Sequence, residues 1–229
     1  MSAGPHAAAA RLEPNDPQSA ATFIRANTKL MRPPLVPELE LHLAAESLPI
    51  WQKTEEDLGE INVPPPYWAF AWAGGQALAR YLLDNAVLVR EKAVLDLGTG
   101  SGLTAIAAKL AGAKSVVASD IDLLALAALR LNAAANGVTV ETTASDLLAH
   151  PPVSHEVVLV GDLFYERELA ERVLAYIEAA AGGGALVLIG DPKRNYFPHG
   201  RFKLAAEYEV PVTRELEDAE IKRTAVWRL

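Results

Sequence analysis

The sequence predicts a doubly wound α/β fold with a mostly parallel sheet and an antiparallel strand pair at its C-terminal end. From about residue 74 onward, short apolar runs alternate with segments whose apolar residues recur at helical spacing. This alternation is typical of parallel strands joined by right-handed crossover helices. The last two apolar runs, at residues 206–213 and 222–229, are separated by an acidic stretch and are therefore expected to pair antiparallel. With 229 residues, 51% of them hydrophobic, the chain can bury one well-packed core.

Residues 1–66 fall outside the alternating pattern and are predicted to form an N-terminal extension to a main domain at residues 67–229. Prolines divide this extension into pieces. The first piece, residues 16–30, is expected to be a helix with Asp16 as its N-cap. Residues 39–43 then alternate between apolar and polar, as a half-buried strand does. We expect the extension to lie on the substrate side of the main domain or to act as a lid.

The main domain is expected to contain four helices and five parallel strands before the C-terminal pair. The helices are expected at residues 74–85, 101–111, 123–136 and 166–181. The strands are expected at residues 94–97, 115–119, 138–143, 156–160 and 185–189.

The composition excludes several classes of function. The chain has 21 Lys and Arg against 29 Asp and Glu, a net charge of −8, which argues against nucleic-acid binding because phosphate contacts need a basic face. It has no cysteine, and its five histidines show no paired ligand spacing, so we expect no metal. No apolar run approaches the roughly 20 residues of a membrane span, and the N-terminus does not resemble a signal peptide. We therefore expect a monomer that binds neither nucleic acid nor membrane, cytoplasmic if bacterial and in the mitochondrial matrix if eukaryotic.

The most informative motif is the run DLGTGSG at residues 96–102, which follows the first clear strand and opens a helix. Its glycines, Gly98, Gly100 and Gly102, allow a tight turn and a close approach of the backbone to a ligand. Their Gly-x-Gly-x-Gly spacing differs from the Gly-x-Gly-x-x-Gly of dinucleotide-binding folds. Asp96 would repel a pyrophosphate but suits a ligand that carries an ammonium and a sulfonium. The motif therefore predicts S-adenosylmethionine as the cofactor.

Two further aspartates follow the next strands of the predicted sheet. Asp120 ends the second strand, where its two oxygens can accept hydrogen bonds from both hydroxyls of a ribose. The alternative is that Asp120 or Asp122 caps the next helix, and we assign the cap to Asp122. Asp146 follows the third strand and is either a partner of the adenine amine or an ordinary loop aspartate.

The fourth strand ends in the segment GDLFYE, at residues 161–166. Ligands of doubly wound sheets lie outside the carboxyl ends of the strands, so Asp162, Phe164 and Tyr165 are expected near the transferred methyl group. A carboxylate and aromatic faces suit a cationic amine. The alternative is that Asp162 caps the helix that starts near Glu166 and that Phe164 is a core residue. The turn at residues 191–195 is interpreted as solvated.

An aromatic stretch precedes the helix that leads to the glycine motif, at residues 64–75. Tyr67, Trp68 and Trp72 within it are candidates for the wall of a ligand site, although such a stretch also occurs in cores. The pair Gly74-Gly75 favours a close approach of a ligand near Trp72.

The residues quoted above resemble a known family. Residues 93–138, AVLDLGTGSGLTAIAAKLAGAKSVVASDIDLLALAALRLNAAANGV, are similar to the cofactor half of the class I, seven-β-strand methyltransferases that use S-adenosylmethionine. Together with PPPYWAFAWAGGQALARYLLDN, GDLFYE and the terminal TAVWRL, they resemble the protein-lysine methyltransferases of the electron transfer flavoprotein β-subunit.

This resemblance implies a Rossmann-like seven-stranded sheet, a lysine methyltransferase activity with S-adenosylhomocysteine as a product, and the electron transfer flavoprotein β-subunit as protein partner. It implies a cofactor site formed by Trp72, Asp96, Gly98, Thr99, Gly100, Gly102, Asp120, Ile121 and Asp146. It implies a lysine entrance with Asp162, Phe164 and Tyr165 as candidate catalytic residues, next to Trp68 and Tyr67 as candidate substrate-binding residues.

Other interpretations of the sequence stay open. The chain is alternatively a small-molecule N-methyltransferase of the nicotinamide type, or a module that binds S-adenosylmethionine without turnover. The glycine spacing disfavours a NAD-dependent oxidoreductase. Residues 1–66 hold 5 basic and 9 acidic residues, a net charge of −4 and half of the total. This suggests an acidic face for a lysine-bearing partner around Glu55, Glu56 and Asp57.

Overall fold

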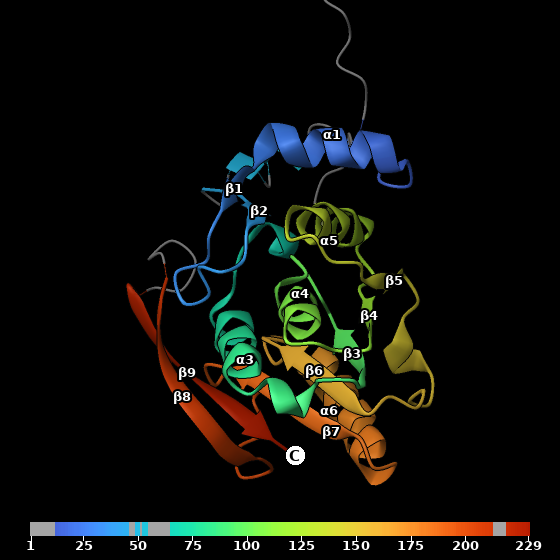
Figure 1. Ribbon diagram of the computed structural model, residues 1–229, viewed down its shortest axis with the longest axis vertical. Coiled ribbons are helices and arrows are strands. Elements are labelled where there is room, and N and C mark those ends of the chain that lie inside the picture. The colour runs from blue at the N-terminus through green and yellow to red at the C-terminus, as the bar shows by residue number, and fades with distance from the viewer. Residues whose placement is uncertain (1–11, 46–48, 51, 55–64, 213–218) are drawn as a thin grey trace, which may run out of the picture.

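The computed structural model describes residues 12–45, 49–50, 52–54, 65–212 and 219–229. Its centre is a seven-stranded sheet with the order β5-β4-β3-β6-β7-β9-β8 (Figure 1). The parallel strands are β3 (Ala93–Leu97), β4 (Ser115–Ser119), β5 (Glu141–Thr143), β6 (Val157–Gly161) and β7 (Leu186–Asp191). The antiparallel strands are β9 (Ile221–Arg228), which pairs with β7, and β8 (Lys203–Pro211). The predicted fold class is confirmed.

Helices cover both faces of this sheet. One face is covered by α3 (Ala73–Asp84), α4 (Leu103–Leu110) and α5 (Leu123–Ala135), and the other by α6 (Arg167–Gly182) (Figure 1). Short 3₁₀ turns connect the elements: η1 (Tyr67–Ala69), η2 (Ala86–Leu88) and η3 (Leu147–Ala149). Along β3, Val94 packs into the cluster under α3 and α4, and Leu95 packs into the cluster under α6. Both faces of the strand are therefore buried, which explains its continuous apolar run.

The N-terminal helix is shorter than predicted. Asp16 caps α1 (Pro17–Asn27) as expected, because its carboxylate accepts the N–H of Ser19 at 2.8 Å. The helix ends at Asn27 instead of residue 30, and β1 (Lys29–Met31) then pairs antiparallel with β2 (Leu41–Leu43). The pairing between strands overrides the helical pattern at the end of that segment.

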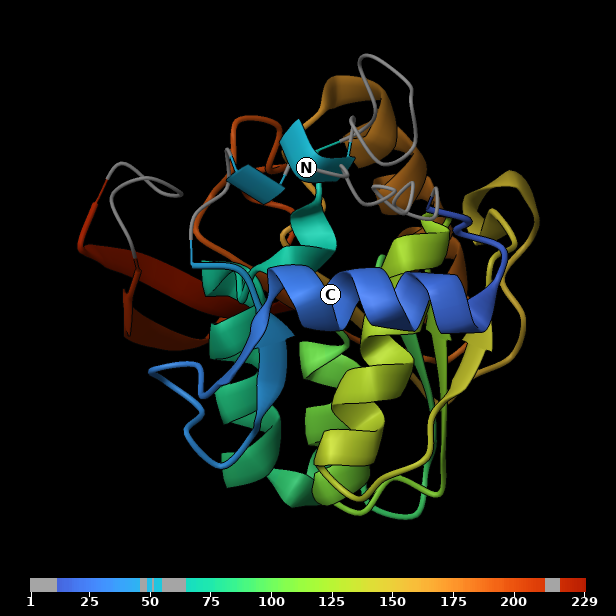
Figure 2. The same ribbon diagram turned by 90° about the horizontal axis from the view of Figure 1, so that it is seen from above.

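The described part of the N-terminal segment packs on the main sheet domain. Helix α1 lies across α5 (Figure 2), and Phe23 and Ile24 share a buried cluster with Leu124 and Ala128. The predicted division at residue 66 is not tested by this packing and stays a prediction. Glu55, Glu56 and Asp57 lie outside the described residues. No helix in the described ranges is long and apolar enough to cross a membrane.

Candidate active site

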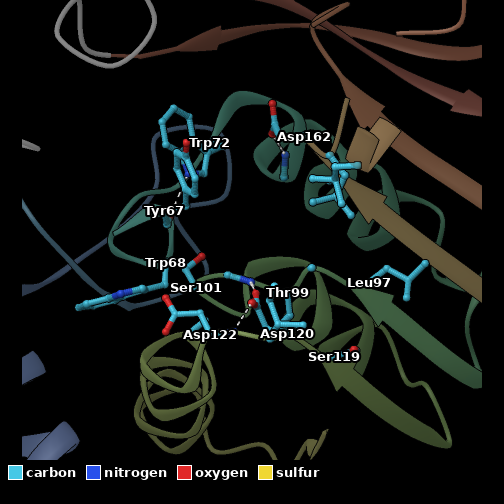
Figure 3. A pocket seen from close by; sticks show the side chains of 18 of the residues that line it. Tyr67, Trp68, Trp72, Leu97, Thr99, Ser101, Ser119, Asp120, Asp122 and Asp162 are labelled. Atoms are coloured by element: carbon cyan, nitrogen blue, oxygen red, sulfur yellow. Dashed lines mark hydrogen bonds between the residues drawn. The ribbon is translucent and has the colours of Figure 1, made fainter. Parts of the chain in front are cut away.

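A cavity of about 660 Å³ opens at the carboxyl ends of β3, β4 and β6, where the strand order reverses (Figure 3). This position and size are usual for a small-molecule site in a doubly wound sheet. Of the residues predicted from the sequence, those that line the cavity are Tyr67, Trp68, Trp72, Gly98, Thr99, Gly100, Asp120, Ile121, Asp146, Asp162 and Tyr165. Those that do not are Asp96, Gly102 and Phe164.

The glycine motif forms the loop between β3 and α4. Gly98 and Gly100 have φ angles of 59° and 50°, a left-handed conformation that favours glycine. A Cβ atom on Gly98 would lie 2.6 Å from the side chain of Leu163. At Gly100, the nearest atom to such a Cβ would be the Cα of Trp68, at 3.9 Å. The loop therefore packs tightly against the β6 end at Gly98 and presents open backbone at Gly100.

Asp96 supports this loop from behind. It is 1% exposed, and its two carboxylate oxygens accept the hydroxyls of Thr99 and Thr104, each at 2.6 Å. Burial raises the pKa of Asp96 to about 6, although the two hydroxyl groups oppose the shift. Asp96 does not line the cavity but fixes the loop that does, and its place beside the ligand stays a prediction.

Asp120 and Asp122 follow β4 and lie on the same wall of the cavity (Figure 3). Asp120 accepts the N–H of Gly100 at 2.9 Å with one oxygen and the N–H of Asp122 at 3.0 Å with the other. Burial raises the pKa of Asp120. Asp122 caps α5 by accepting the N–H of Leu124 at 2.8 Å, which confirms the predicted cap. Asp120 therefore ties the glycine loop to β4, and its role toward a ribose stays a prediction.

At the end of the cavity away from Asp162, Asp146 and Arg172 form an ion pair that the sequence did not reveal. Asp146 accepts the N–H of Leu148 at 3.2 Å and the guanidinium of Arg172 at 2.6 Å. Arg172 projects from α6, on the opposite side of the sheet from the glycine loop's helix, and also lines the cavity. No sequence spacing linked these two residues, because they come from separate elements. The proposed contact of Asp146 with an adenine amine stays a prediction.

Asp162 is held in place by three groups. Its φ angle is 58°, which is unusual for a non-glycine residue, and its N–H donates to the carbonyl of Gly190 at 3.0 Å. One carboxylate oxygen accepts the N–H of Gly75 at 2.9 Å. The other accepts Nε and Nη2 of Arg194 at 3.0 and 2.7 Å. Such a fixed, strained residue in a cavity wall is common at functional sites. Glu166, and not Asp162, is the N-cap residue of α6, so the capping alternative is wrong.

Arg194 is a cavity residue that sequence analysis missed, because residues 191–195 were interpreted as a solvated turn. Its guanidinium carbon lies 5.5 Å from the centroid of the Trp72 ring. Its backbone N–H donates to Asp191 at 2.7 Å. The available signal was position: Arg194 follows β7 at the same sheet edge where the aspartates follow β4 and β6. The interpretation as a solvated turn is therefore wrong for Arg194.

Aromatic side chains line the cavity near Asp162. The ring of Tyr67 lies 5.9 Å from that of Trp72 and 5.3 Å from that of Tyr165. The indole N–H of Trp72 donates to the carbonyl of Tyr67 at 2.9 Å. Burial raises the pKa of Tyr165 to about 12. Trp68 borders the cavity as well, but it also belongs to the buried cluster that α1 and α5 share.

Two sequence interpretations are corrected here. Phe164 is fully buried, and its ring meets that of Phe197 edge-on at 5.5 Å, so it takes the core position that the sequence left open as the alternative. The close approach at Gly74 is not to a ligand. A Cβ on Gly74 would lie 2.2 Å from the carbonyl oxygen of Gly190, so this glycine allows α3 to pack directly on β7.

The polar groups and apolar walls of the cavity fit S-adenosylmethionine. The cavity joins an open glycine loop, carboxylates at the ends of β4 and β5, and apolar walls, and each arginine that lines it is paired with an aspartate. In the described ranges, no group of three or more His, Asp or Glu residues is placed to hold a metal ion. The seven-stranded sheet, with its glycine loop after β3 and its carboxylate after β4, is that of the S-adenosylmethionine-dependent methyltransferases.

Comparisons with known proteins agree with that class. A family model described as ribosomal protein L11 methyltransferase matches residues 76–176. The electron transfer flavoprotein beta subunit lysine methyltransferase of Mus musculus is 37% identical over 220 residues, which are 93% of this chain and 84% of that protein. The Homo sapiens protein of the same name is 36% identical over 93% of this chain and 82% of its own length. This chain belongs to the family of electron transfer flavoprotein beta subunit lysine methyltransferases.

The fold also recurs in solved structures. A Thermoplasma acidophilum protein of known structure is 20% identical, with a TM-score of 0.50 over 67% of this chain and 88% of that chain. At this identity the likeness concerns the fold alone.

Proposed function

We propose that this chain transfers methyl groups from S-adenosylmethionine to lysine side chains of the electron transfer flavoprotein β-subunit. Membership of the family supports the substrate. Within the site, the supporting observation is that Asp162, Trp72 and Tyr67 line the same cavity (Figure 3). The carboxylate can accept an N–H of a lysine amine, and the aromatic rings can pack along the apolar part of its side chain.

We assign the cofactor to the wall of the cavity that the loops after β3, β4 and β5 form, opposite Asp162. The backbone of residues 98–100 would border its methionine part, Asp120 would accept the ribose hydroxyls, and Asp146 would accept the adenine amine. When bound, S-adenosylmethionine supplies a methyl group that passes to the lysine nitrogen while sulfur keeps the electron pair of the broken C–S bond, which leaves S-adenosylhomocysteine.

The chain's own residues then have two tasks. Asp162 accepts an N–H of the substrate amine and so orients its lone pair toward the cofactor wall. Tyr67 and Tyr165 form the sides of the part of the cavity that receives the lysine side chain, and they exclude water from its amine. The lysine must lose one proton to solvent before it attacks, because an ammonium has no free lone pair.

The N-terminal segment contributes to the wall of the same cavity. Pro14 and Thr54 line it together with Pro65 and Pro66, which lead into η1. This supports the proposal that residues 1–66 lie on the substrate side. A variant that starts at residue 66 is expected to keep some affinity for the cofactor and to lose most of its affinity for the protein substrate.

The experiment that tests the proposed function uses the full chain and purified electron transfer flavoprotein. The β-subunit is incubated with the enzyme and methyl-labelled S-adenosylmethionine, and peptides are sequenced by mass spectrometry. Label on lysine, absent with the Asp162→Asn variant, is the expected result. Label on arginine, label on small molecules only, or no label despite bound cofactor would refute the proposal.

A further inference from the structure

The carboxylate at the lysine end of the cavity already has a cation as its partner. Arg194 donates two hydrogen bonds to one oxygen of Asp162, and the side chains of Arg194 and Asp162 are only 17% and 10% exposed. The same guanidinium lies over the ring of Trp72. Both features that would stabilise an incoming ammonium, the negative charge and the aromatic face, are thus engaged by Arg194.

Three other ionisable groups lie around this pair. Asp191, at the end of β7, is fully buried behind Arg194, and burial together with the charge of Asp162 raises its pKa to about 7. Tyr67 and Tyr165 line the same cavity from η1 and from the loop after β6, and burial raises the pKa of both, so both are neutral near pH 7. On the far side of Tyr165, the carboxylates of Glu166 and Asp120 act on that phenol. The pair itself is therefore close to neutral.

We propose that Arg194 is a positioning residue that neutralises Asp162, so that the substrate lysine occupies the site as an uncharged amine. The inference rests on the proposed function. An unpaired carboxylate would hold the lysine as an ammonium, whose nitrogen has no lone pair for the methyl group. The guanidinium prevents this, since a nearby positive charge favours the neutral form of an amine. Asp162 keeps one role toward the substrate, which is to accept an N–H of that amine.

The test is the pH dependence of kcat at saturating electron transfer flavoprotein β-subunit, because kcat reports the protonation of groups in the enzyme–substrate complex. In Arg194→Met, which keeps the length of the side chain without its charge, the rise of activity with pH should move about one unit toward alkaline pH. The loss should be about tenfold near pH 7 and should largely disappear near pH 9. Arg194→Lys keeps the charge and should keep the parental pH profile.

A matched control removes the other arginine of the cavity. Arg172→Met breaks the ion pair with Asp146 at the opposite end, so it should change cofactor affinity without moving the pH profile. The double variant Asp162→Asn with Arg194→Met removes both charges of the pair, and the low activity that remains without the carboxylate should follow pH as the parent does. This double variant also leaves no unpaired buried charge, so it covers the case in which Arg194→Met alone fails to fold.

The outcomes separate the two proposals. An equal loss of activity at every pH in Arg194→Met, or a shifted profile in Arg194→Lys, would overturn the role of Arg194 and leave the proposed function standing. A parent enzyme that binds the cofactor in calorimetry and forms no methyl-lysine would refute the proposed function, and the role of Arg194 with it. A shift confined to Arg194→Met and reversed in the double variant supports the proposal.

Discussion

The two ends of the cavity are built in different ways. At the cofactor end, carboxylates bind nearby backbone: Asp120 accepts N–H groups of Gly100 and Asp122, all within one strand-helix-strand unit. At the lysine end, Asp162 accepts the N–H of Gly75 in α3 and pairs with Arg194 in the loop after β7. The glycine loop and Asp120 at the first end depend on local sequence, whereas Asp162 at the second end depends on the assembled tertiary structure. Their functions should therefore respond differently to substitution.

The largest expected effect comes from Asp162→Asn. Methyl transfer at saturating cofactor should fall about 100- to 1,000-fold, because the amine exchanges a carboxylate acceptor for a weaker amide oxygen and Arg194 keeps an uncompensated charge. Calorimetry should find the affinity for S-adenosylmethionine within about threefold of the parental value. A cofactor affinity lowered as much as the rate would break the division between the two ends.

Sequence predicted the cofactor end better than the lysine end for the same reason. The run at residues 96–102 and the caps at Asp16 and Asp122 are local patterns, and the structure has the glycine loop and both caps where the sequence indicated. The pairing of Asp162 with Arg194 spans 32 positions and depends on how β7 is placed beside β6. Gly74 was misread likewise, because its partner Gly190 is distant in sequence.

Replacing Asp191 tests the charge balance at the lysine end of the cavity through the free energy of unfolding. Its pKa in the folded protein is about 7 against an ordinary 3.8. The contribution of Asp191 to the free energy of unfolding is therefore fully present below about pH 4, where the carboxyl group is neutral, and is lost as pH rises through 7. Asp191→Asn keeps the oxygen that accepts the Arg194 N–H and removes this loss. A rise of three pKa units corresponds to about 4 kcal/mol, which water penetration should reduce to about 2 kcal/mol.

Urea unfolding at pH 5 and pH 8 measures this difference. The Asn variant should gain over the parent at pH 8 and differ less at pH 5. Glu171→Gln, an exposed carboxyl group on α6, serves as the control and should change stability little at either pH. An equal effect of Asp191→Asn at both pH values would contradict the account.

Gly74 and Gly75 form a matched pair for the contact between α3 and β7. A Cβ at position 74 would lie 2.2 Å from a backbone oxygen, so Gly74→Ala should lower the free energy of unfolding by about 2 kcal/mol. At position 75 the nearest atom would be a side-chain methyl at 3.5 Å, so Gly75→Ala should be neutral or stabilise by up to about 1 kcal/mol. Thermal unfolding of the two variants should rank them in that order, and the reverse order would show that α3 does not pack as described.

The smallest effect on a function of the cavity is expected for Asp120→Ala. The dissociation constant for S-adenosylmethionine should rise about tenfold, equal to about 1.4 kcal/mol, because the ribose acceptor is lost and the glycine loop loses one tie to β4. Asn136→Ala, which removes two hydrogen bonds with Glu40 of the N-terminal segment, serves as a control outside the cavity. A cofactor affinity that is unchanged in Asp120→Ala would contradict the assignment of the ribose to that wall.

The division of the cavity is tested most directly by single-turnover methylation of the electron transfer flavoprotein β-subunit at saturating S-adenosylmethionine, with methyl-lysine measured by mass spectrometry. Asp120→Ala should methylate the same lysines as the parent at a rate within about threefold, because excess cofactor compensates for its weaker binding. Asp162→Asn, with the cofactor bound, should form almost no methyl-lysine. Parental rates in Asp162→Asn, or an inactive Asp120→Ala that has bound its cofactor, would contradict the account.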